Sequence, residues 1–470
     1  MSQKNEMPLL ILSLLITVAL LGSGFWFFRE QILGSLSSNQ NRVDPPTSQP
    51  GQEQQRISSG NTILVKADAT SQKQAGVEAF TKGDYATAIS QFQASLQEQR
   101  NDPETLIYLN NTKAVGKNPI KIAVVVPIGG NLNIAKEILR GVAQAQDEID
   151  RAGGIKGRLL QVAIANDDNN PDTSKQIAAK LVKDSNILAV VGHNTSNATL
   201  AAVPEYQQGE LVIVSPTSDA KALTNTSSYF FRTIPSIRFQ ADALSRYALR
   251  TARIGKIGIC IDSQSAASLS LQEEFTSAVF ADGGRVVELN CDLSAASFNP
   301  NTIVSEAISN GADSLLLAPS VERLNLATEI AKANKQRLSL LGSSTMYTFQ
   351  TLEQGKADVN GMVLAVPWHP NSFPGNPFPQ QAIQLWGGEV NWRSALAYDA
   401  TLAIITGFKQ GEISRQGLQK TLANPNFSSQ GATGDISFLP SGDRNSGSIF
   451  VQVQPGQKSG TGFDFVPLPP

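Results

Sequence analysis

The segment KIAVVVPI at residues 121–128 is a short apolar run rich in β-branched side chains, and the chain repeats this pattern. An amphipathic stretch at 133–151 follows it, and a second apolar run, LLQVAIAND, occupies residues 159–167. The alternation continues through ILAVVGH (187–193), KIGICID (256–262), RVVELN (285–290), SLLLAP (314–319) and LSLLGSS (338–344). Apolar runs separated by helices are typical of parallel strands joined by crossover helices. The sequence therefore predicts an α/β fold with parallel, doubly wound sheets.

The α/β pattern is longer than a single sheet requires. We therefore expect two lobes within residues 118–470, with the chain crossing near Thr233–Pro235 and returning near Val363–Pro367. Asn133 is the expected cap of the first helix. The predicted boundaries are 120–235 and 363–430 for lobe 1, and 236–362 with the C-terminal strands for lobe 2.

The composition excludes several classes of protein. Lys and Arg number 38 and Asp and Glu 40, so a net charge of -2 provides no positive field for nucleic acid. The two histidines and two cysteines are far apart, without C-x-x-C or H-E-x-x-H spacing, so we expect no metal and no cofactor. The sequence also lacks G-x-S-x-G and G-x-x-x-x-G-K-[ST], and we expect no enzyme activity and no catalytic residues.

The N-terminal region differs in composition from the rest. Residues 8–28 carry no charge and are long enough to span a bilayer. A cleaved signal is one interpretation, but the bulky cluster Phe25–Phe28 favours a retained transmembrane anchor or signal-anchor over residues 1–30. Residues 31–70 are rich in Ser, Gln, Asn, Pro and Gly over most of their length, which predicts a flexible linker.

Helical spacing returns over residues 71–117. The string GVEAFTKGDYATAISQFQASL resembles a tetratricopeptide repeat, with Gly83, Tyr85, Ala88 and Phe92 at the spacing of its interlocking positions. A second repeat starts at Pro103 and ends early, so the module is shorter than such arrays need to fold alone. Two interpretations remain open: Tyr85 and Phe92 pack the helix pair onto the next domain, or the helices form a groove for a partner peptide.

Polar side chains follow two of the predicted strands. Thr195 and Ser196 come after ILAVVG, while Thr217, Ser218 and Asp219 come after LVIVS. Ligands of open α/β sheets bind beyond the carboxyl ends of strands, where such turns can hold a small carboxylate or amide. Helix capping by Ser196 and a proline-initiated turn are the alternative interpretations.

Other polar residues have structural interpretations. His193 is expected to be a hydrogen-bonded structural residue, and Tyr398 and Asp399 to pack and cap within lobe 1. Cys260 ends one predicted strand and Cys291 follows the next, which allows either a disulfide or two buried thiols.

Five segments share their order with one known family. They are RGVAQAQDEIDRAGGIKGRLLQVAIANDDNNP (140–171), AVVGHNTSNATLAAVPEY (189–206), IVSPTSDAKALT (213–224), YFFRTIPS (229–236) and ALAYDA (395–400). Together they resemble the type I periplasmic solute-binding proteins of the branched-chain amino acid, amide and urea transporter class, which includes leucine-binding proteins. The resemblance extends from Ile120 to about Gly456.

The resemblance implies a two-lobed clamshell that closes on a small ligand. In this family the serine of the G-H-x-x-S turn, here Ser196, holds the ligand carboxylate, and the loop matching Thr217–Asp219 contacts carboxylate and ammonium. Asp219 stands where a threonine is common, and its charge could pair with an ammonium or amide. In lobe 2, Ser265 and Ser344 are the expected contacts, in loops where the family often has a tyrosine and an acidic residue.

We therefore expect a receptor tethered by one span to a bacterial inner membrane, with its soluble part in the periplasm. It would capture a small polar solute, such as an amino acid, an amide or urea, for an ABC permease or a membrane sensor. The alternative is a tethered interaction or regulatory protein with a degenerate cleft and a helical partner-binding module.

Overall fold

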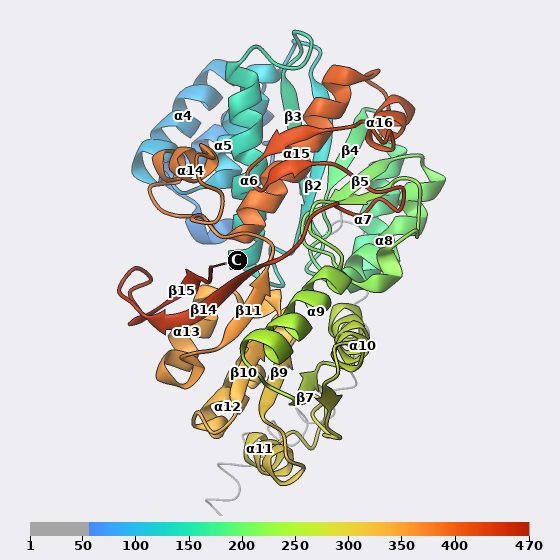
Figure 1. Cartoon of the computed structure of the whole chain (residues 1–470). Coiled ribbons are helices and arrows are strands. Elements are labelled where there is room, and N and C mark those ends of the chain that lie inside the picture. The colour runs from blue at the N-terminus through green and yellow to red at the C-terminus, as the bar shows by residue number, and fades with distance from the viewer. Residues whose placement is uncertain (1–55, 470) are drawn as a thin grey trace, which may run out of the picture. The chain divides into compact units, whose positions relative to one another are not determined.

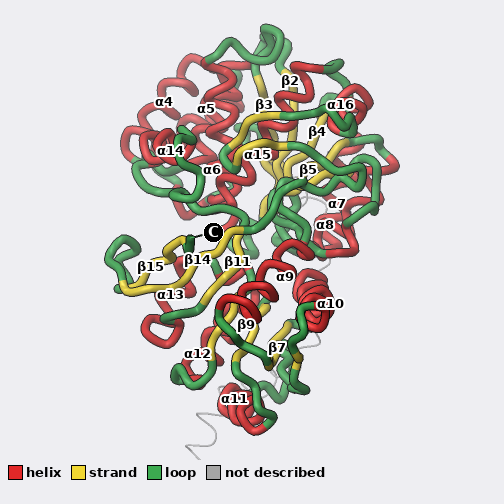
Figure 2. The backbone as a smooth tube through the Cα atoms, viewed as in Figure 1, coloured by secondary structure: helices red, strands yellow, loops and turns green. Residues whose placement is uncertain are grey.

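The computed structural model of the chain describes residues 56–469, which form two α/β lobes (Figure 1). The sheet of lobe 1 has six strands and that of lobe 2 has seven. Helices flank the strands of both sheets (Figure 2). The prediction of a two-lobed α/β fold is confirmed.

The lobe 1 sheet has the strand order β1-β3-β2-β4-β5-β6. Its neighbouring strands run parallel except for β1, which pairs antiparallel with β3. Parallel neighbours need crossover connections, and helices follow β2, β3 and β4. The bounds are β1 (Ile57–Ser58), β2 (Ile120–Val126), α6 (Leu132–Arg151), β3 (Leu160–Asn166), α7 (Pro171–Lys183), β4 (Ile187–Val191), α8 (Ser196–Gln208), β5 (Val212–Ser215) and β6 (Phe230–Arg232).

Successive residues of β2 face opposite layers of lobe 1. Val124 belongs to the same hydrophobic cluster as Ile138 of α6. Val125 belongs to a second cluster, with Tyr206 of α8. Both faces of the sheet are therefore covered, which explains why this strand is continuously apolar.

The lobe 2 sheet has the strand order β15-β14-β11-β10-β9-β7-β8. Strands β7 to β11 pair in parallel, whereas β14 and β15 form an antiparallel hairpin at one edge. The strands are β7 (Lys256–Ile261), β8 (Arg285–Val286), β9 (Ser314–Ala318), β10 (Ser339–Gly342), β11 (Val363–Val366), β14 (Ile449–Pro455) and β15 (Phe463–Pro467). The helices are α9 (Ile237–Arg246), α10 (Ala266–Ala281), α11 (Pro300–Ser309), α12 (Leu324–Asn334) and α13 (Phe349–Gly355).

Three details differ from the sequence-based expectation. Strand β11, which we assigned to lobe 1, lies in the lobe 2 sheet because Val363 pairs with Leu341 of β10. The sheets are mixed rather than purely parallel, since β1, β14 and β15 run antiparallel to their neighbours. The cap of α6 is Asn131, whose Oδ1 accepts a hydrogen bond from the Ile134 amide at 3.1 Å, and not Asn133.

After β11 the chain returns to lobe 1. Helix α15 packs lengthwise against α6. The returning elements are α14 (Phe378–Trp386), α15 (Trp392–Gln410), α16 (Arg415–Leu422) and the hairpin strands β12 (Ser429–Gly431) and β13 (Gly434–Ile436).

Within the described residues, three α-helices precede the first long strand: α3 (Ser71–Thr81), α4 (Tyr85–Glu98) and α5 (Pro103–Ala114). Helices α3 and α4 approach closely, because a Cβ added to Gly76 would lie 2.6 Å from the Phe92 ring. Helix α5 joins this pair to lobe 1, since Asn111 Nδ2 donates to the carbonyl of Val162 in β3 at 2.7 Å. Phe92 is buried within the module, while Tyr85 is exposed.

Residues 56–70 differ from the predicted flexible linker. Ile57 and Ser58 pair with β3, and Glu104 of α5 accepts the Leu64 amide at 2.8 Å. Hydrogen bonds of this kind to distant residues offset the cost of ordering a polar segment, and composition alone does not reveal them.

The predicted membrane anchor over residues 1–30 lies outside the described residues. Among residues 56–469, no helix combines the length and apolar character needed to cross a membrane.

Candidate ligand-binding cleft

Strand ends from both lobes border one cleft of about 460 Å³. In lobe 1 the turns after β4 and β5 contribute, and in lobe 2 the turns after β7, β9 and β10. Because parallel strands present their carboxyl ends at one edge of a sheet, two such edges facing each other form a polar crevice. The lining residues are Asp168, Asn169, Asn170, Pro171, Asn194, Thr195, Ser196, Asn197, Thr217, Asp219, Asp262, Gln264, Ser265, Ala267, Pro319, Ser320, Val321, Glu322, Arg323, Ser344, Thr345, Trp392 and Arg393.

The first wall of the cleft is the amino end of α8. Thr195 caps this helix, with Oγ1 accepting the Ala198 amide at 3.3 Å. Ser196 Oγ accepts the Ala220 amide at 3.2 Å and so joins this turn to the one after β5. The first amides of a helix have no partner within the helix, and they favour a negative group.

The turn after β5 brings Thr217 and Asp219 to the cleft but not Ser218. Thr217 Oγ1 donates to the Asn194 carbonyl at 2.7 Å, which fixes the two turns against each other. Ser218 is fully buried and does not line the cleft, because its Oγ is occupied by Thr199 Oγ1 at 2.7 Å and the His193 carbonyl at 3.2 Å. The expectation that Ser218 contacts the ligand is thus replaced by a role in holding the turn.

Asp219 brings a buried carboxyl group to the lobe 1 wall. Its side chain lines the cleft, and the residue is almost fully buried. Burial raises the pKa of Asp219 to about 6, against the lowering effect of the Arg232 guanidinium. Arg232 is itself bound to Asp443, with 2.6 Å between Nε and Oδ1, so its charge is shared.

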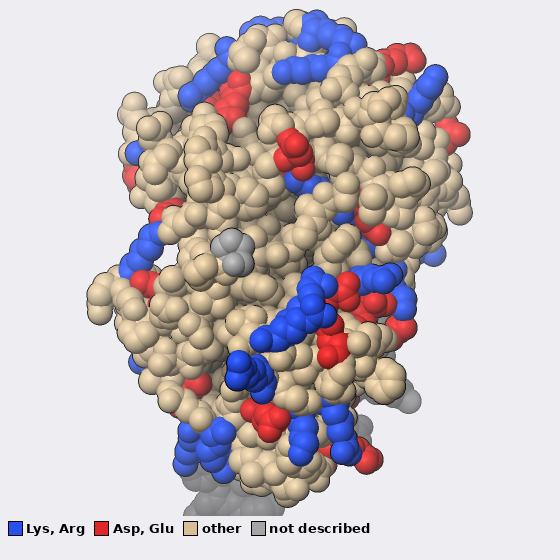
Figure 3. Space-filling view, in the orientation of Figure 1, with Lys and Arg blue, Asp and Glu red and all other residues tan. Residues whose placement is uncertain are grey.

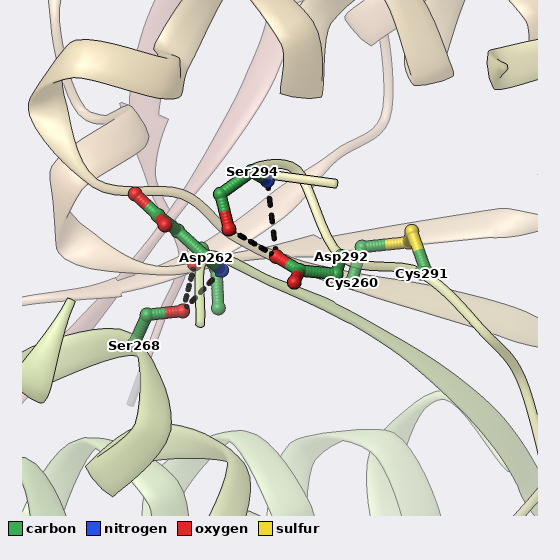
Figure 4. The surroundings of a disulfide bond; sticks show 7 residues. Cys260, Asp262, Ser268, Cys291, Asp292 and Ser294 are labelled. Atoms are coloured by element: carbon green, nitrogen blue, oxygen red, sulfur yellow. Dashed lines mark hydrogen bonds between the residues drawn. A yellow bond between two sulfur atoms is a disulfide. The ribbon is translucent and has the colours of Figure 1, made fainter. Parts of the chain in front are cut away.

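Lobe 2 contributes the two expected serines and two acidic residues, Asp262 and Glu322. Ser265 caps α10 and Ser344 follows β10, and both line the cleft. Asp262, at the end of β7, lines it too and is buried. Ser268 Oγ accepts the Asp262 amide at 2.8 Å and holds this strand end in place (Figure 4).

Cys260 and Cys291 form a disulfide beside this strand end (Figure 4). Of the two alternatives that the sequence left open, the structure has the disulfide. The bridge ties the segment after β8 to β7, and the Cys291 carbonyl accepts the Ile261 amide at 2.9 Å. Such bonds persist in oxidising compartments outside the cytoplasm.

Three residues for which the sequence predicts structural roles are buried and do not line the cleft: His193, Tyr398 and Asp399. His193 Nδ1 lies 2.7 Å from Asp167 Oδ2 and Nε2 lies 3.0 Å from the Tyr206 hydroxyl, which confirms its hydrogen-bonded structural role. Tyr398 donates to Glu148 Oε2 at 2.6 Å, and Asp399 accepts the Ala432 amide at 2.6 Å, as expected for packing and capping within lobe 1.

Several lining residues were not predicted. Asp262 and Ser320 follow predicted strands, so the rule that located Ser196 would have found them. Trp392 and Arg393 have no such signal, because they begin a helix that returns to lobe 1 late in the sequence.

Residues 56–469 contain no group of three or more histidine, cysteine or acidic side chains that could hold a metal ion. Basic and acidic residues are interspersed on the face that Figure 3 shows.

Two α/β lobes facing each other across a polar cleft define a ligand-binding protein of the clamshell class. The sequence model of the family described as periplasmic binding protein matches residues 119–459, and the chain belongs to this family. The predicted family and the absence of enzyme activity, which follows from it, are confirmed. The match does not include residues 71–117, so the tetratricopeptide resemblance stays a prediction.

Curated relatives share part of the sequence. A leucine-, isoleucine-, valine-, threonine- and alanine-binding protein of Pseudomonas aeruginosa is 23% identical over 337 residues, 70% of this chain and 88% of that protein. An amino acid binding protein of the same organism is 27% identical over 138 residues, which are 29% of this chain and only 37% of that protein.

Solved structures share the fold. A leucine-binding protein of Thermotoga maritima superposes with a TM-score of 0.66 at 19% identity, covering 74% of this chain and 97% of that one. A solute-binding protein of Rhodopseudomonas palustris in complex with 3,4-dihydroxybenzoic acid has a TM-score of 0.64 at 17% identity, covering 75% and 96%. At such identities the likeness establishes the fold and not the ligand.

Proposed function

We propose that this protein is a membrane-tethered, extracytoplasmic solute-binding receptor. It captures one small polar solute, of the amino acid, amide or urea-like class, between its lobes. The closed form is then recognised by an ABC permease or a membrane sensor. Family membership supports the binding role, and the ligands of the similar proteins, amino acids and an aromatic acid, support a small solute.

The cleft between the two sets of strand ends carries this proposal. Its volume of about 460 Å³ suits a molecule of amino acid size. It is lined by hydroxyls, amides and carboxylates from both lobes, so a bound solute contacts both walls at once. A solute shifts an open-to-closed equilibrium only if it contacts the closed form better, and contacts from two lobes satisfy that condition.

We assign the solute contacts to Thr195, Ser196, Thr217 and Asp219 in lobe 1 and to Ser265 and Ser344 in lobe 2. The hydroxyls and the α8 amides offer donors to a carboxylate or carbonyl group, while Asp219 offers an acceptor to an ammonium or amide N–H. No cofactor or metal takes part in this binding scheme.

Thermal-shift screening of the full-length chain against amino acids, amides, urea and small aromatic acids tests the function. At least one compound is expected to raise the melting temperature in a concentration-dependent way. In the Ser196→Ala/Thr217→Ala double variant, calorimetric affinity for that compound should fall about tenfold or more, because two contacts are lost.

Matched changes on the exposed face of α11, Thr302→Ala and Ser305→Ala, provide the control and should leave the affinity unchanged. Unaltered affinity in the cleft variant would exclude the two turns as the site. If no compound in the panel bound, the receptor function would be rejected in favour of a tethered interaction protein that uses the helical module at 71–117.

The tether itself is the second part of the proposal. Residues 1–30 would anchor the chain in the inner membrane, residues from 31 would link the anchor to the body, and the body would lie in the periplasm. In fractionated cells the chain should stay with membranes after carbonate washing, and external protease should reach it once the outer membrane is opened. Release of the full-length chain by the wash would contradict the anchor.

A further inference from the structure

Arg393 is a buried cation on the wall of the cleft. It is the second residue of α15 and lines the cleft from the lobe 1 side, yet only 2% of the residue is exposed. The neighbouring Trp392 lines the same cleft, and its ring centroid lies 4.4 Å from the guanidinium carbon of Arg393. This stacking holds the guanidinium without using any of its N–H groups.

The guanidinium of Arg393 lacks hydrogen-bond partners at two of its three nitrogens. Among the described residues, neither Nε nor Nη1 has a partner, and the buried indole Nε1 of Trp392 lacks one as well. The carboxylate of Glu137 attracts Arg393 electrostatically, but its oxygens are already engaged by other groups. Arg140 Nη1 donates to Oε1 at 2.6 Å, and the Asn391 amide and the Ser394 hydroxyl donate to Oε2.

An arginine in this state is costly to the unliganded fold. Removing a charge from water without hydrogen-bond partners is unfavourable, and native proteins rarely leave buried donors unpaired. Burial lowers the pKa of Arg393 to about 10, with Glu137 acting in the opposite direction, so the group is still positive at neutral pH. A structural role gives no reason to keep the charge, whereas an anionic ligand supplies the missing acceptors.

The charges around the cleft restrict the kind of anion. Four acidic residues line the same cleft against one further cation, Arg323, and this excess of carboxylates would repel a doubly charged phosphate; the acidic residues are Asp168, Asp219, Asp262 and Glu322. A carboxylate carries a single charge and matches the planar fork of a guanidinium with two parallel hydrogen bonds. The acidic residues of the cleft can accept hydrogen bonds from donor groups elsewhere on the solute.

We propose that Arg393 binds a carboxylate of the solute, so that the cleft accepts carboxylic acids and rejects their neutral amides and urea. This inference rests on the proposed receptor function and narrows its solute class. Arg393 is thereby a specificity-determining residue, additional to the hydroxyl-rich turns.

The test compares acids with the corresponding amides on the full-length chain by titration calorimetry. The probe pairs are L-leucine with L-leucinamide and 4-hydroxybenzoate with 4-hydroxybenzamide, in which the amide has no carboxylate; urea is the fifth probe. At least one acid should bind, and its amide should bind about 100-fold more weakly, because the amide leaves the buried guanidinium without an anionic partner.

Variants at position 393 identify the residue responsible. Arg393→Met should weaken binding of the selected acid about 100-fold, and Arg393→Lys should give an intermediate loss because it keeps the charge but not the fork. Arg151→Met removes an exposed cation from the same lobe and should leave the affinity unchanged. Without any probe, Arg393→Met should melt no lower than the native chain, because the cost of burying two unpaired guanidinium nitrogens offsets the stacking on Trp392 and the attraction to Glu137.

Each outcome separates the inference from the function it rests on. If none of the five probes binds, the receptor function fails and the inference fails with it. If urea or an amide binds as tightly as the best acid, or if Arg393→Met keeps the affinity for that acid, the receptor function stands and the inference fails. If Arg393→Met does not fold, a structural role is indicated, and equal binding of acid and amide by Arg393→Lys would then reject the inference.

Discussion

Two of the regions that bury charged side chains compensate them in opposite ways. In the N-terminal helices, Lys73 Nζ lies 2.8 Å from Asp102 Oδ2 and 2.8 Å from Glu104 Oε2, and all three side chains are inaccessible to solvent. In the cleft, Arg393 is almost equally buried, but its Nε and Nη1 have no partner among the described residues. The first charge is balanced by the fold, and the second is balanced only when a ligand binds.

The pKa shifts of the two cations follow from this difference. Burial lowers the pKa of Lys73, but the carboxylates of Glu104 and Asp102 outweigh burial, and the net pKa lies above the usual value. Burial dominates at Arg393 and lowers its pKa to about 10, because Glu137 opposes it only weakly. Equal burial therefore has opposite consequences according to whether counter-charges are in contact.

The largest expected effect is at the compensated site. Lys73→Met leaves two carboxylates buried without their cation, and we expect the free energy of unfolding to fall by about 3–5 kcal/mol. Denaturant unfolding followed by circular dichroism measures this loss. Affinity for the acid probes should be unchanged, because Lys73 does not line the cleft.

The matched control is Lys82→Met, at an exposed position that follows the same helix. Its effect on stability should lie within about 0.5 kcal/mol. A loss below 1 kcal/mol for Lys73→Met would mean that the carboxylates relax into solvent or become protonated. Lys73 would then not be an example of a charge that the fold balances, and the contrast with Arg393 would not hold.

A smaller effect is expected at Asp219, a second ionisable group of the cleft. Its pKa in the folded protein is raised to about 6 by burial, above the ordinary 3.8, so the ionised carboxylate destabilises the fold. This destabilisation is absent below pH 3.8, grows as the pH rises from 3.8 to about 6, and is complete above pH 6. Asp219→Asn should thus raise the free energy of unfolding at pH 7.5 by on the order of 2 kcal/mol, with a smaller gain at pH 4.5.

Asp292 provides a comparison of opposite sign. Burial raises its pKa, but hydrogen bonds from Ser263 and Ser294 outweigh burial and lower it to about 2. Asp292→Asn should therefore destabilise the fold at pH 7.5, and the difference should disappear as the pH falls from 3.8 toward 2. Thermal unfolding of both variants across this pH range checks the signs, and a stabilised Asp292→Asn would contradict the assignment.

The fold could be predicted because its signals are local. Apolar runs such as 121–126 are long enough to identify strands buried on both faces, and the order of five segments identified the family. The predictions that were wrong concern strands whose pairing partners lie far away in the sequence. Nothing in residues 56–58 indicates that they join β3, and nothing within 363–366 indicates which lobe's sheet they enter.

The site was predicted in part, for the same reason. Thr195, Ser196, Thr217 and Asp219 were located by their places in loops at strand ends, and Ser265 and Ser344 through the family resemblance; all six line the cleft. Ser218 shares that position, but its hydroxyl turns to Thr199, a choice that sequence cannot reveal. Arg393 begins a helix whose packing against α6 carries it to the cleft, so only the tertiary arrangement makes it visible.

The smallest expected effect concerns Asn197, which joins the lobes beside the cleft with neutral hydrogen bonds. Its Nδ2 donates to the Gln264 carbonyl at 2.8 Å, and its Oδ1 accepts the Ala266 amide at 2.9 Å. These contacts link the amino ends of α8 and α10, so they stabilise the closed arrangement. Because partly exposed neutral bonds contribute little, Asn197→Ala should weaken acid binding only about threefold, with unfolding of the lobes unchanged.

Calorimetry of Asn197→Ala with the best acid probe measures this loss, and Asn186→Ala is the control, because the Asn186 side chain donates to Asp184 Oδ1 in the same lobe. If Asn197→Ala lost as much affinity as Arg393→Met, closure rather than charge would dominate binding, and the distinction between compensated and uncompensated charges would not explain the site. A loss near threefold would leave Arg393 as the main determinant, since a buried guanidinium with two unpaired nitrogens has far more to gain from a ligand than an amide group that already has two hydrogen bonds.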